Sequence, residues 1–283
     1  MARALLGRGL LVDVAERLAS ERIEVAPLKG MLFHLRRPGL TRRMVDIDIA
    51  VRPRERARAL AILEASGFRE RGRGDGTRTL RHEALPIDLD VHWRLFQTGL
   101  FHLSVDGMLD RSSRSDIGGA TVSIPDAPDV LAHLVGHYAR DRHDGTERRH
   151  LTDFALVSEL WRTDPRECAQ RLDACGMRRA ACYVLPLVVE ATADALVAAV
   201  LSELDCGWRD RAVAQVAAAV LSRHPGSDPV GALGCHMLNS SLPRGLFSLA
   251  IHGTRGAVTR GARLAQRGSG ARARAETGEA PAP

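Results

Sequence analysis

Acidic residues alternate with apolar residues between Val45 and Val51, and this alternation could build a metal site. Asp46 and Asp48 are separated by a single isoleucine. On a β-strand, side chains two residues apart share a face, so both carboxylates would lie side by side. Neighbouring carboxylates raise each other's pKa unless a cation neutralises them, and Mg²⁺ is usually held by one or two carboxylates plus substrate phosphates. The alternative is an acidic face exposed on an edge strand.

A second alternating segment, from Pro86 to Trp93, favours the metal interpretation. Asp88, Asp90 and His92 would share one face of a strand, with apolar residues on the other face. If this strand lies beside the first in a sheet, up to four carboxylates converge on one surface. A third carboxylate across from an Asp-x-Asp pair is what two-metal nucleotidyl transfer requires, because one metal activates the attacking oxygen and the other holds the triphosphate.

Lys29 and Gly30 follow a predicted strand and open a predicted helix, which makes them a candidate phosphate-binding turn. Glycine allows close approach of the backbone to a ligand, and a helix N-terminus presents free N–H groups to an anion. Of the 40 basic residues, 39 are arginine and Lys29 alone is lysine, a bias that chance could also produce. Arg42 and Arg43 could add positive charge near the same phosphates, or could simply be solvated.

Hydrophobic periodicity predicts the elements that must position these groups. The expected helices cover 3–20, the stretch that begins at Lys29 and stops at Pro38, and the stretch from Pro53 to Gly67. The expected strands are 23–26, 44–51, 77–82 and 86–93, with a turn at 72–76, an antiparallel pairing of the last two strands, and a hairpin of 113–117 with 120–124.

After Pro128 the sequence shows only helical periodicity as far as about Ala250. We therefore expect an α+β protein in which a domain with a small mixed sheet (1–125) precedes an all-helical domain (126–253). Residues 254–283 are rich in Gly, Ala and Arg, and we predict a disordered basic tail.

Charge and composition exclude several classes of protein. Apolar residues make up 45% of the 283 residues, which excludes global disorder. The net charge is +6, but the tail alone holds six arginines and two glutamates, so duplex DNA is an unlikely partner for the nearly balanced remainder. No signal peptide or membrane span is predicted.

The five cysteines contain no Cys-x-x-Cys pair, so we predict a reduced, cytoplasmic setting. Cys168, Cys175 and Cys182 recur every seven residues, which indicates a packed stripe on helix faces.

Several of these segments together resemble the uncharacterised nucleotidyltransferase family of the DNA polymerase beta-like superfamily. The resemblance covers roughly residues 5–160. It is carried by Leu28-Lys29-Gly30, Arg42 to Ile49, Gly67-Phe68, Asp90 to Leu95, Asp129 to His137, and Leu151 to Phe154.

The resemblance implies a nucleotidyltransferase core with Asp46 and Asp48 as metal ligands and Asp90 as the third carboxylate. It also implies two Mg²⁺ ions and an NTP as co-substrate, with the triphosphate held by Lys29 and Gly30 together with Arg42 and Arg43. The wider superfamily has Gly-Ser in the phosphate turn, whereas Met31 follows Gly30 here. Backbone N–H groups and the lysine would therefore hold the phosphates.

Histidines supply a further set of candidates. His133 and His137 lie four residues apart, so they share one helix face, either lining the site or packing at the edge of a core. Asp88 has no assigned role, and His92 either borders the metal site or hydrogen-bonds at a strand end. Three residues near the charged stretch 140–149 are predicted to be solvated surface: His143, Asp144 and His150.

The sequence therefore predicts Mg²⁺-dependent transfer of a nucleoside monophosphate from an NTP to a hydroxyl or phosphate of a small molecule, peptide or protein. Two alternatives stay open. One is an inactive nucleotide-binding or regulatory module, suggested by the missing serine. The other is a metal-dependent phosphohydrolase that uses Asp46 and Asp48 with His133 and His137. The acceptor and the oligomeric state are not encoded in any motif recognised in the sequence.

Overall fold

The computed structural model describes residues 2–42, 44–141, 147–224 and 229–240. Within these residues, every strand lies in the N-terminal half of the chain. Its elements are α1 (Ala2–Ser20), β1 (Ala26–Leu28), α2 (Lys29–Arg36), β2 (Asp46–Ala50), a 3₁₀ turn (Pro53–Glu55), α3 (Arg56–Ala65), β3 (Phe68–Gly74), β4 (Thr77–His82), β5 (Asp88–His92), α4 (Val105–Arg111), β6 (Ser113–Ile117) and β7 (Ala120–Ile124).

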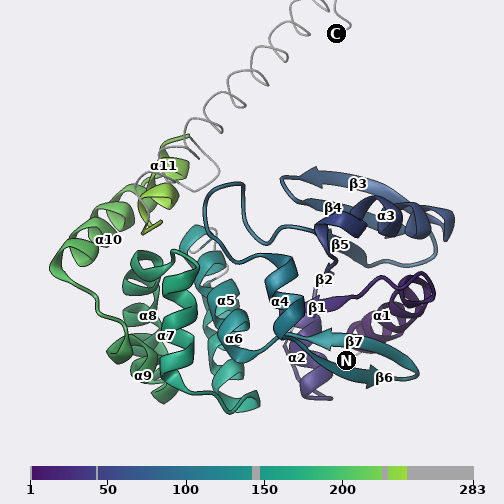
Figure 1. Cartoon of the computed structure of the whole chain (residues 1–283), viewed down its shortest axis with the longest axis horizontal. Coiled ribbons are helices and arrows are strands. Elements are labelled where there is room, and N and C mark those ends of the chain that lie inside the picture. Colours follow the sequence, from purple (N-terminus) through teal and green to yellow (C-terminus); the bar gives the residue numbers. More distant parts are fainter. Residues whose placement is uncertain (1, 43, 142–146, 225–228, 241–283) are drawn as a thin grey trace, which may run out of the picture.

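Helices alone follow β7 in the part of the chain that the structure describes. They are α5 (Ala127–Asp141), α6 (Glu147–Leu160), α7 (Pro165–Ala174), α8 (Arg178–Thr192), α9 (Ala195–Glu203), α10 (Trp208–Leu221) and α11 (Pro229–Met237). Figure 1 shows the sheet on one side of the molecule, the later helices on the other, and α2 and α4 between them. The protein is thus α+β, as expected; the predicted boundary at 125/126 falls between β7 and α5, and the predicted tail lies outside the described residues.

The five-stranded sheet has the order β1-β2-β5-β4-β3. β2 and β5 are parallel neighbours, and β4 pairs with β5 in the antiparallel sense, as the alternation predicted. The register places Asp46 opposite Asp88 and Asp48 opposite Asp90. Because β1 and β5 flank β2, the alternative of an exposed edge strand is wrong. One face of the sheet therefore carries the acidic residues of both strands, and the apolar residues of the other face are buried.

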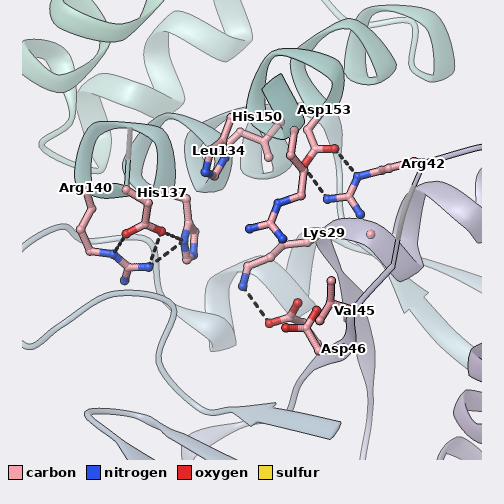
Figure 2. A pocket seen from close by; sticks show the side chains of 13 residues that line it. Lys29, Arg42, Val45, Asp46, Leu134, His137, Arg140, His150 and Asp153 are labelled. Atoms are coloured by element: carbon pink, nitrogen blue, oxygen red, sulfur yellow. Dashed lines mark hydrogen bonds and ion pairs between the residues drawn. The ribbon is translucent and has the colours of Figure 1, made fainter. Parts of the chain in front are cut away.

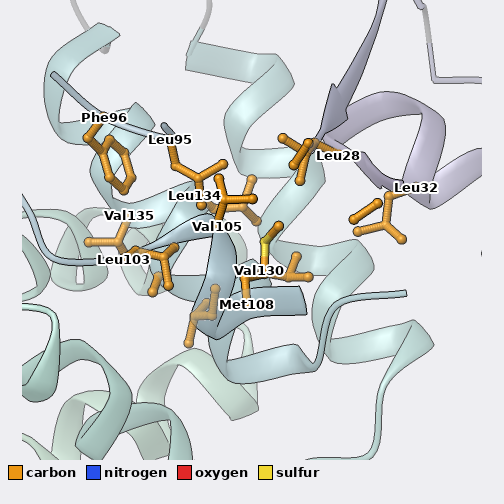
Figure 3. Close-up of a cluster of buried hydrophobic side chains, with 14 of the residues drawn as sticks. Leu28, Leu32, Leu95, Phe96, Leu103, Val105, Met108, Val130, Leu134 and Val135 are labelled. Atoms are coloured by element: carbon orange, nitrogen blue, oxygen red, sulfur yellow. The ribbon is translucent and has the colours of Figure 1, made fainter. Parts of the chain in front are cut away.

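A continuous hydrophobic core joins the sheet region to the helical region. Figure 3 shows side chains of β1, α2, α4 and α5 beside those that follow β5, including Leu28, Leu32, Phe96 and Leu134. On the other side of α2, Phe33 packs edge-to-face on Trp161 beyond α6, with ring centroids 6.1 Å apart. The sheet region and the helical region are therefore packed tightly against each other around α2.

Two elements were missed by the sequence prediction, and one was displaced. β3 occupies 68–74, where only a turn at 72–76 was expected, and α4 was not expected. The β3 sequence, Phe-Arg-Glu-Arg-Gly-Arg-Gly, lacks apolar alternation because β3 is an edge strand whose side chains are mostly exposed. The first strand is 26–28 rather than 23–26, directly against α2.

The cysteines differ from the expectation of a fully reduced chain. Cys182 on α8 forms a disulfide with Cys206, which lies between α9 and α10. Of the three cysteines in the predicted stripe, Cys168 and Cys175 are buried and free, whereas Cys182 is the one in the disulfide. Among the described helices, none combines the length and apolar character needed to cross a bilayer.

Candidate active site

The parallel pairing of β2 with β5 brings an acidic cluster together. Ligand atoms of Asp48, Asp90 and His92 all lie within 4.8 Å of one another. Asp46 stands two residues before Asp48 on the same face of β2, as strand geometry requires. Asp48 is buried, and Asp46 and Asp90 are half-buried. The three aspartates singled out from the sequence therefore share one surface.

Asp48 is the best-satisfied of these carboxylates. Its Oδ1 accepts from Lys29 Nζ and from His92 Nε2, both at 2.8 Å. The other ring nitrogen of His92, Nδ1, lies 2.8 Å from the Thr77 hydroxyl, which donates to it. Burial alone would raise the pKa of Asp48, but the Lys29 ammonium and the His92 hydrogen bond outweigh it and hold that pKa well below its usual value.

Asp46 and Asp90 are less well compensated. Burial raises the pKa of Asp46, and the charge of Asp48 raises it further. Burial also raises the pKa of Asp90, against a hydrogen bond from Thr79. Among the described residues, Asp90 Oδ1 is buried and has no hydrogen-bond partner. Carboxylates that are desolvated and short of positive charge fit a divalent cation, and an oxygen-rich donor set suits Mg²⁺.

Asp88 lies on the same face but has its own partner. Its two oxygens accept from Arg81 Nε and Nη2 on the neighbouring strand β4, both at 2.6 Å. The register places Arg81 directly opposite Asp88. This extra acid is therefore neutralised by the sheet itself, and three of the four predicted carboxylates are left for the cluster.

Lys29 begins α2 with unusual backbone geometry. Its φ is +46°, in the left-handed region that costs a residue with a Cβ about 1–2 kcal/mol. Strain of this kind persists where the surroundings fix it, and it clusters at functional sites. Here the chain turns sharply from β1 into α2, and this turn directs Lys29 Nζ onto Asp48.

Gly30 and Arg42 form one unit. A Cβ on Gly30 would lie 2.2 Å from Arg42 Nη1. Glycine at this position therefore makes room for the Arg42 guanidinium. Arg42 forms a two-pronged ion pair with Asp153 of α6 through Nε and Nη2, the second bond measuring 2.8 Å. The side chains of Arg42 and Asp153 are only 8% and 4% exposed. Arg42 is therefore fixed in the wall between the two regions rather than solvated, and Arg43 lies outside the described residues.

A pocket opens between the acidic cluster and the helices α5 and α6. Figure 2 shows Lys29 reaching down to the carboxylates of β2, while on the helical side Arg42 meets Asp153 and Arg140 contacts His137. The pocket is lined by Lys29, Gly30, Arg42, Val45, Asp46, Asp48, Leu134, His137, Arg140, Asp141, Arg149, His150 and Asp153.

The two predicted histidines of α5 are both buried beside this pocket. The ring centroids of His133 and His137 are 4.5 Å apart, and the Nε2 atoms of both rings are buried without a hydrogen-bond partner among the described residues. Burial lowers the pKa of His137 to about 3 and that of His133 well below its usual value, so both rings are neutral. His137 lines the pocket, whereas His133 packs behind it against Phe96.

Residues near the start of α6 correct one expectation from the sequence. His150 is buried and lines the pocket instead of lying on a solvated surface, and burial lowers its pKa to about 4. His143 and Asp144 lie outside the described residues. Asp141, Arg149 and Asp153 were not singled out as site residues, although Asp153 belongs to the Leu-Thr-Asp-Phe segment that the sequence analysis had noted.

Comparison with known proteins gives a family match. A profile of a family described as an uncharacterised nucleotidyltransferase matches residues 1–192, well over half of the chain. Among curated proteins, none matches the sequence significantly.

Solved structures with a similar fold include three distant ones. The antibiotic-resistance factor ANT(2'')-Ia has 15% identity and a TM-score of 0.44, covering 59% of this chain and 89% of that one. An antigenic nucleotidyltransferase-like protein from Paracoccidioides brasiliensis has 19% identity and a TM-score of 0.47, covering 71% and 94%. JHP933 from Helicobacter pylori has 12% identity and a TM-score of 0.40, covering 93% and 99%.

Proposed function

Since the chain belongs to the uncharacterised nucleotidyltransferase family, we propose that it moves a nucleoside monophosphate from an NTP to a hydroxyl or phosphate acceptor with Mg²⁺. The supporting observation is the register of β2 and β5, which puts Asp46, Asp48 and Asp90 on one face beside Lys29. An acceptor oxygen would attack the α-phosphorus, the bond to the bridging oxygen would break, and pyrophosphate would leave.

The acidic cluster would supply the metal ligands. Asp46 and Asp48 would hold both Mg²⁺ ions, and Asp90 would hold the catalytic one. When bound, such ions polarise phosphoryl oxygens and ease deprotonation of the attacking hydroxyl. Asp90 would take up that proton at Oδ1, which is buried and lacks a hydrogen-bond partner among the described residues. His92 would hold Asp48 in place through the 2.8 Å hydrogen bond.

Positive charge near the turn from β1 into α2 would hold the triphosphate. The Lys29 ammonium, which contacts Asp48 here, would contact phosphate oxygens of the NTP as well. The first N–H groups of α2, which receive no side-chain cap from Leu28, would add the partial positive charge of a helix N-terminus. Arg42, fixed beside Gly30, would contribute its charge to the wall of the same pocket.

The acceptor would be a hydroxyl or phosphate of a small molecule, a peptide or a protein. We place the enzyme in the cytoplasm, where NTPs and Mg²⁺ are available; the Cys182–Cys206 bridge is an unusual feature for that compartment. Incubation of the purified protein with Mg²⁺, α-labelled NTPs and cell extract tests the function, because the labelled species identifies the acceptor.

Lys29→Arg tests whether the single lysine matters. We expect kcat/KM for NMP transfer to fall at least about tenfold, because a planar guanidinium must replace a compact ammonium against an Asp48 side chain that is only 4% exposed. Steady-state pyrophosphate release measures this, with the melting temperature as a check on folding. Unchanged kinetics would mean that the lone lysine reflects composition and carries no role.

A further inference from the structure

The helical side of the pocket carries hydrogen-bond donors that the proposed chemistry does not yet use. His137 comes from α5, and Arg149 comes from the first turn of α6. Both line the same pocket as Lys29. The acidic cluster accounts for the metals, and Lys29 with the first turn of α2 accounts for part of the triphosphate charge, so donors on the helical side would add to the binding of the departing pyrophosphate.

The contacts of His137 fix where its ring proton lies. Arg140 Nη2 is 3.1 Å from His137 Nδ1, and a guanidinium can only donate, so Nδ1 accepts. Asp141 Oδ2 lies 3.4 Å from the same nitrogen, which is long for a hydrogen bond. In a neutral imidazole the proton must then sit on Nε2. His137 therefore presents a buried N–H donor with no acceptor among the described residues.

Arg149 supplies a full positive charge to the same pocket. It is exposed, and within the described ranges no carboxylate forms an ion pair with it. The other two arginines that line the pocket form ion pairs: Arg42 with Asp153, and Arg140 with Asp141.

Two helix N-termini meet at the same pocket. Lys29 and Gly30 form the first turn of α2, and Arg149 and His150 belong to the first turn of α6. Each N-terminus carries a partial positive charge that favours a multiply charged anion. The donors on this side are all N–H groups, and the two carboxylates beside them, Asp141 and Asp153, are held by arginines. The wall is therefore suited to phosphate oxygens rather than to a cation.

We propose that His137 and Arg149 form the subsite for the β- and γ-phosphates of the NTP, and hence for the pyrophosphate that leaves. This inference rests on the proposed function. It assigns the leaving group to the helical region and the metal-bound α-phosphate to the sheet. The acceptor must then approach Asp90 from the side away from α6, because the attacking and leaving oxygens lie in line across the phosphorus.

Binding of Mg²⁺–pyrophosphate to the full chain, measured by titration calorimetry, tests the subsite without requiring turnover. We expect Arg149→Met and His137→Leu each to weaken binding about 10- to 100-fold, the range for loss of a hydrogen bond to a charged group. Arg148→Met is the matched control, because Arg148 is an exposed neighbour on α6 that does not line the pocket. Equal affinities for the Arg148 and Arg149 variants would overturn the proposal.

Long-range ¹H–¹⁵N NMR on the wild-type protein reports the His137 tautomer directly, even if His137→Leu folds poorly. The subsite requires a proton on Nε2 and a bare Nδ1; a proton on Nδ1 would remove the donor and refute its role. NMP transfer with unchanged pyrophosphate affinity in Arg149→Met rejects the subsite alone, whereas weakened pyrophosphate binding in a protein that never transfers NMP rejects the function alone.

Discussion

Asp46→Asn and Asp90→Asn are each expected to lower the rate of NMP transfer at least about 1000-fold. Each variant removes a carboxylate that would neutralise a metal, and metal stabilisation of the transition state is worth several kcal/mol, with about 1.4 kcal/mol for each factor of ten. Asp90→Asn also removes the group that would accept the proton. Pyrophosphate release at saturating NTP measures the loss.

Stability provides the control for these two variants. Because burial raises the pKa of Asp46 and Asp90, the folded protein holds their protons more tightly than the unfolded chain does. The contribution of these two carboxylates to the stability of the metal-free protein must therefore fall as the pH rises above the ordinary aspartate pKa and through the raised one. Removing either charge should leave the melting temperature at pH 7 equal to the wild-type value or above it. A variant that loses activity and also melts earlier would point to a structural role for the carboxylate.

Asp153→Asn is expected to cost about 3–5 kcal/mol of the free energy of unfolding, the largest stability effect we predict. The substitution leaves the Arg42 guanidinium, only 8% exposed, without its counter-charge at the junction of α6 with the sheet region. Gly30 leaves room for that guanidinium, so an unpaired Arg42 would also disturb the phosphate turn. Urea unfolding followed by circular dichroism measures the change.

The double variant Arg42→Met/Asp153→Leu distinguishes the cost of breaking the ion pair from one side from the cost of removing both charges. A buried ion pair replaced by apolar groups of similar size often loses little stability, whereas breaking it from one side is expensive. The double variant should therefore be more stable than Asp153→Asn. Effects of Arg42→Met and Asp153→Leu that simply add would show that the two side chains do not stabilise each other.

The acidic cluster could be predicted from the sequence because its geometry is local. Strand periodicity places Asp46 with Asp48 and Asp90 with His92, and only the pairing of the two strands remained to be learned. The local sequence pattern could not show that Arg81 neutralises Asp88. That ion pair depends on the register of β4, which no single segment encodes.

The helical side of the pocket could not be predicted in the same way. Arg42 and Asp153 are 111 residues apart, and their contact depends on how α6 docks on α2. His150 lies at the edge of a charged stretch, so its local sequence suggests surface, yet the packing of α5 and α6 buries it. Disulfide pairing of Cys182 with Cys206 likewise depends on how α8 lies against the end of α9.

Transfer of NMP by this carboxylate cluster is tested most directly with one NTP labelled in parallel at its α- and γ-phosphates. With Mg²⁺ and cell extract, we predict that the α-label becomes bound to an acceptor while the γ-label appears in pyrophosphate, and that Asp46→Asn loses both. An α-label left in free nucleotide while the γ-label appears as inorganic phosphate would instead indicate a phosphohydrolase. Binding of the NTP without any turnover would indicate an inactive module, and either result would contradict the proposed transfer.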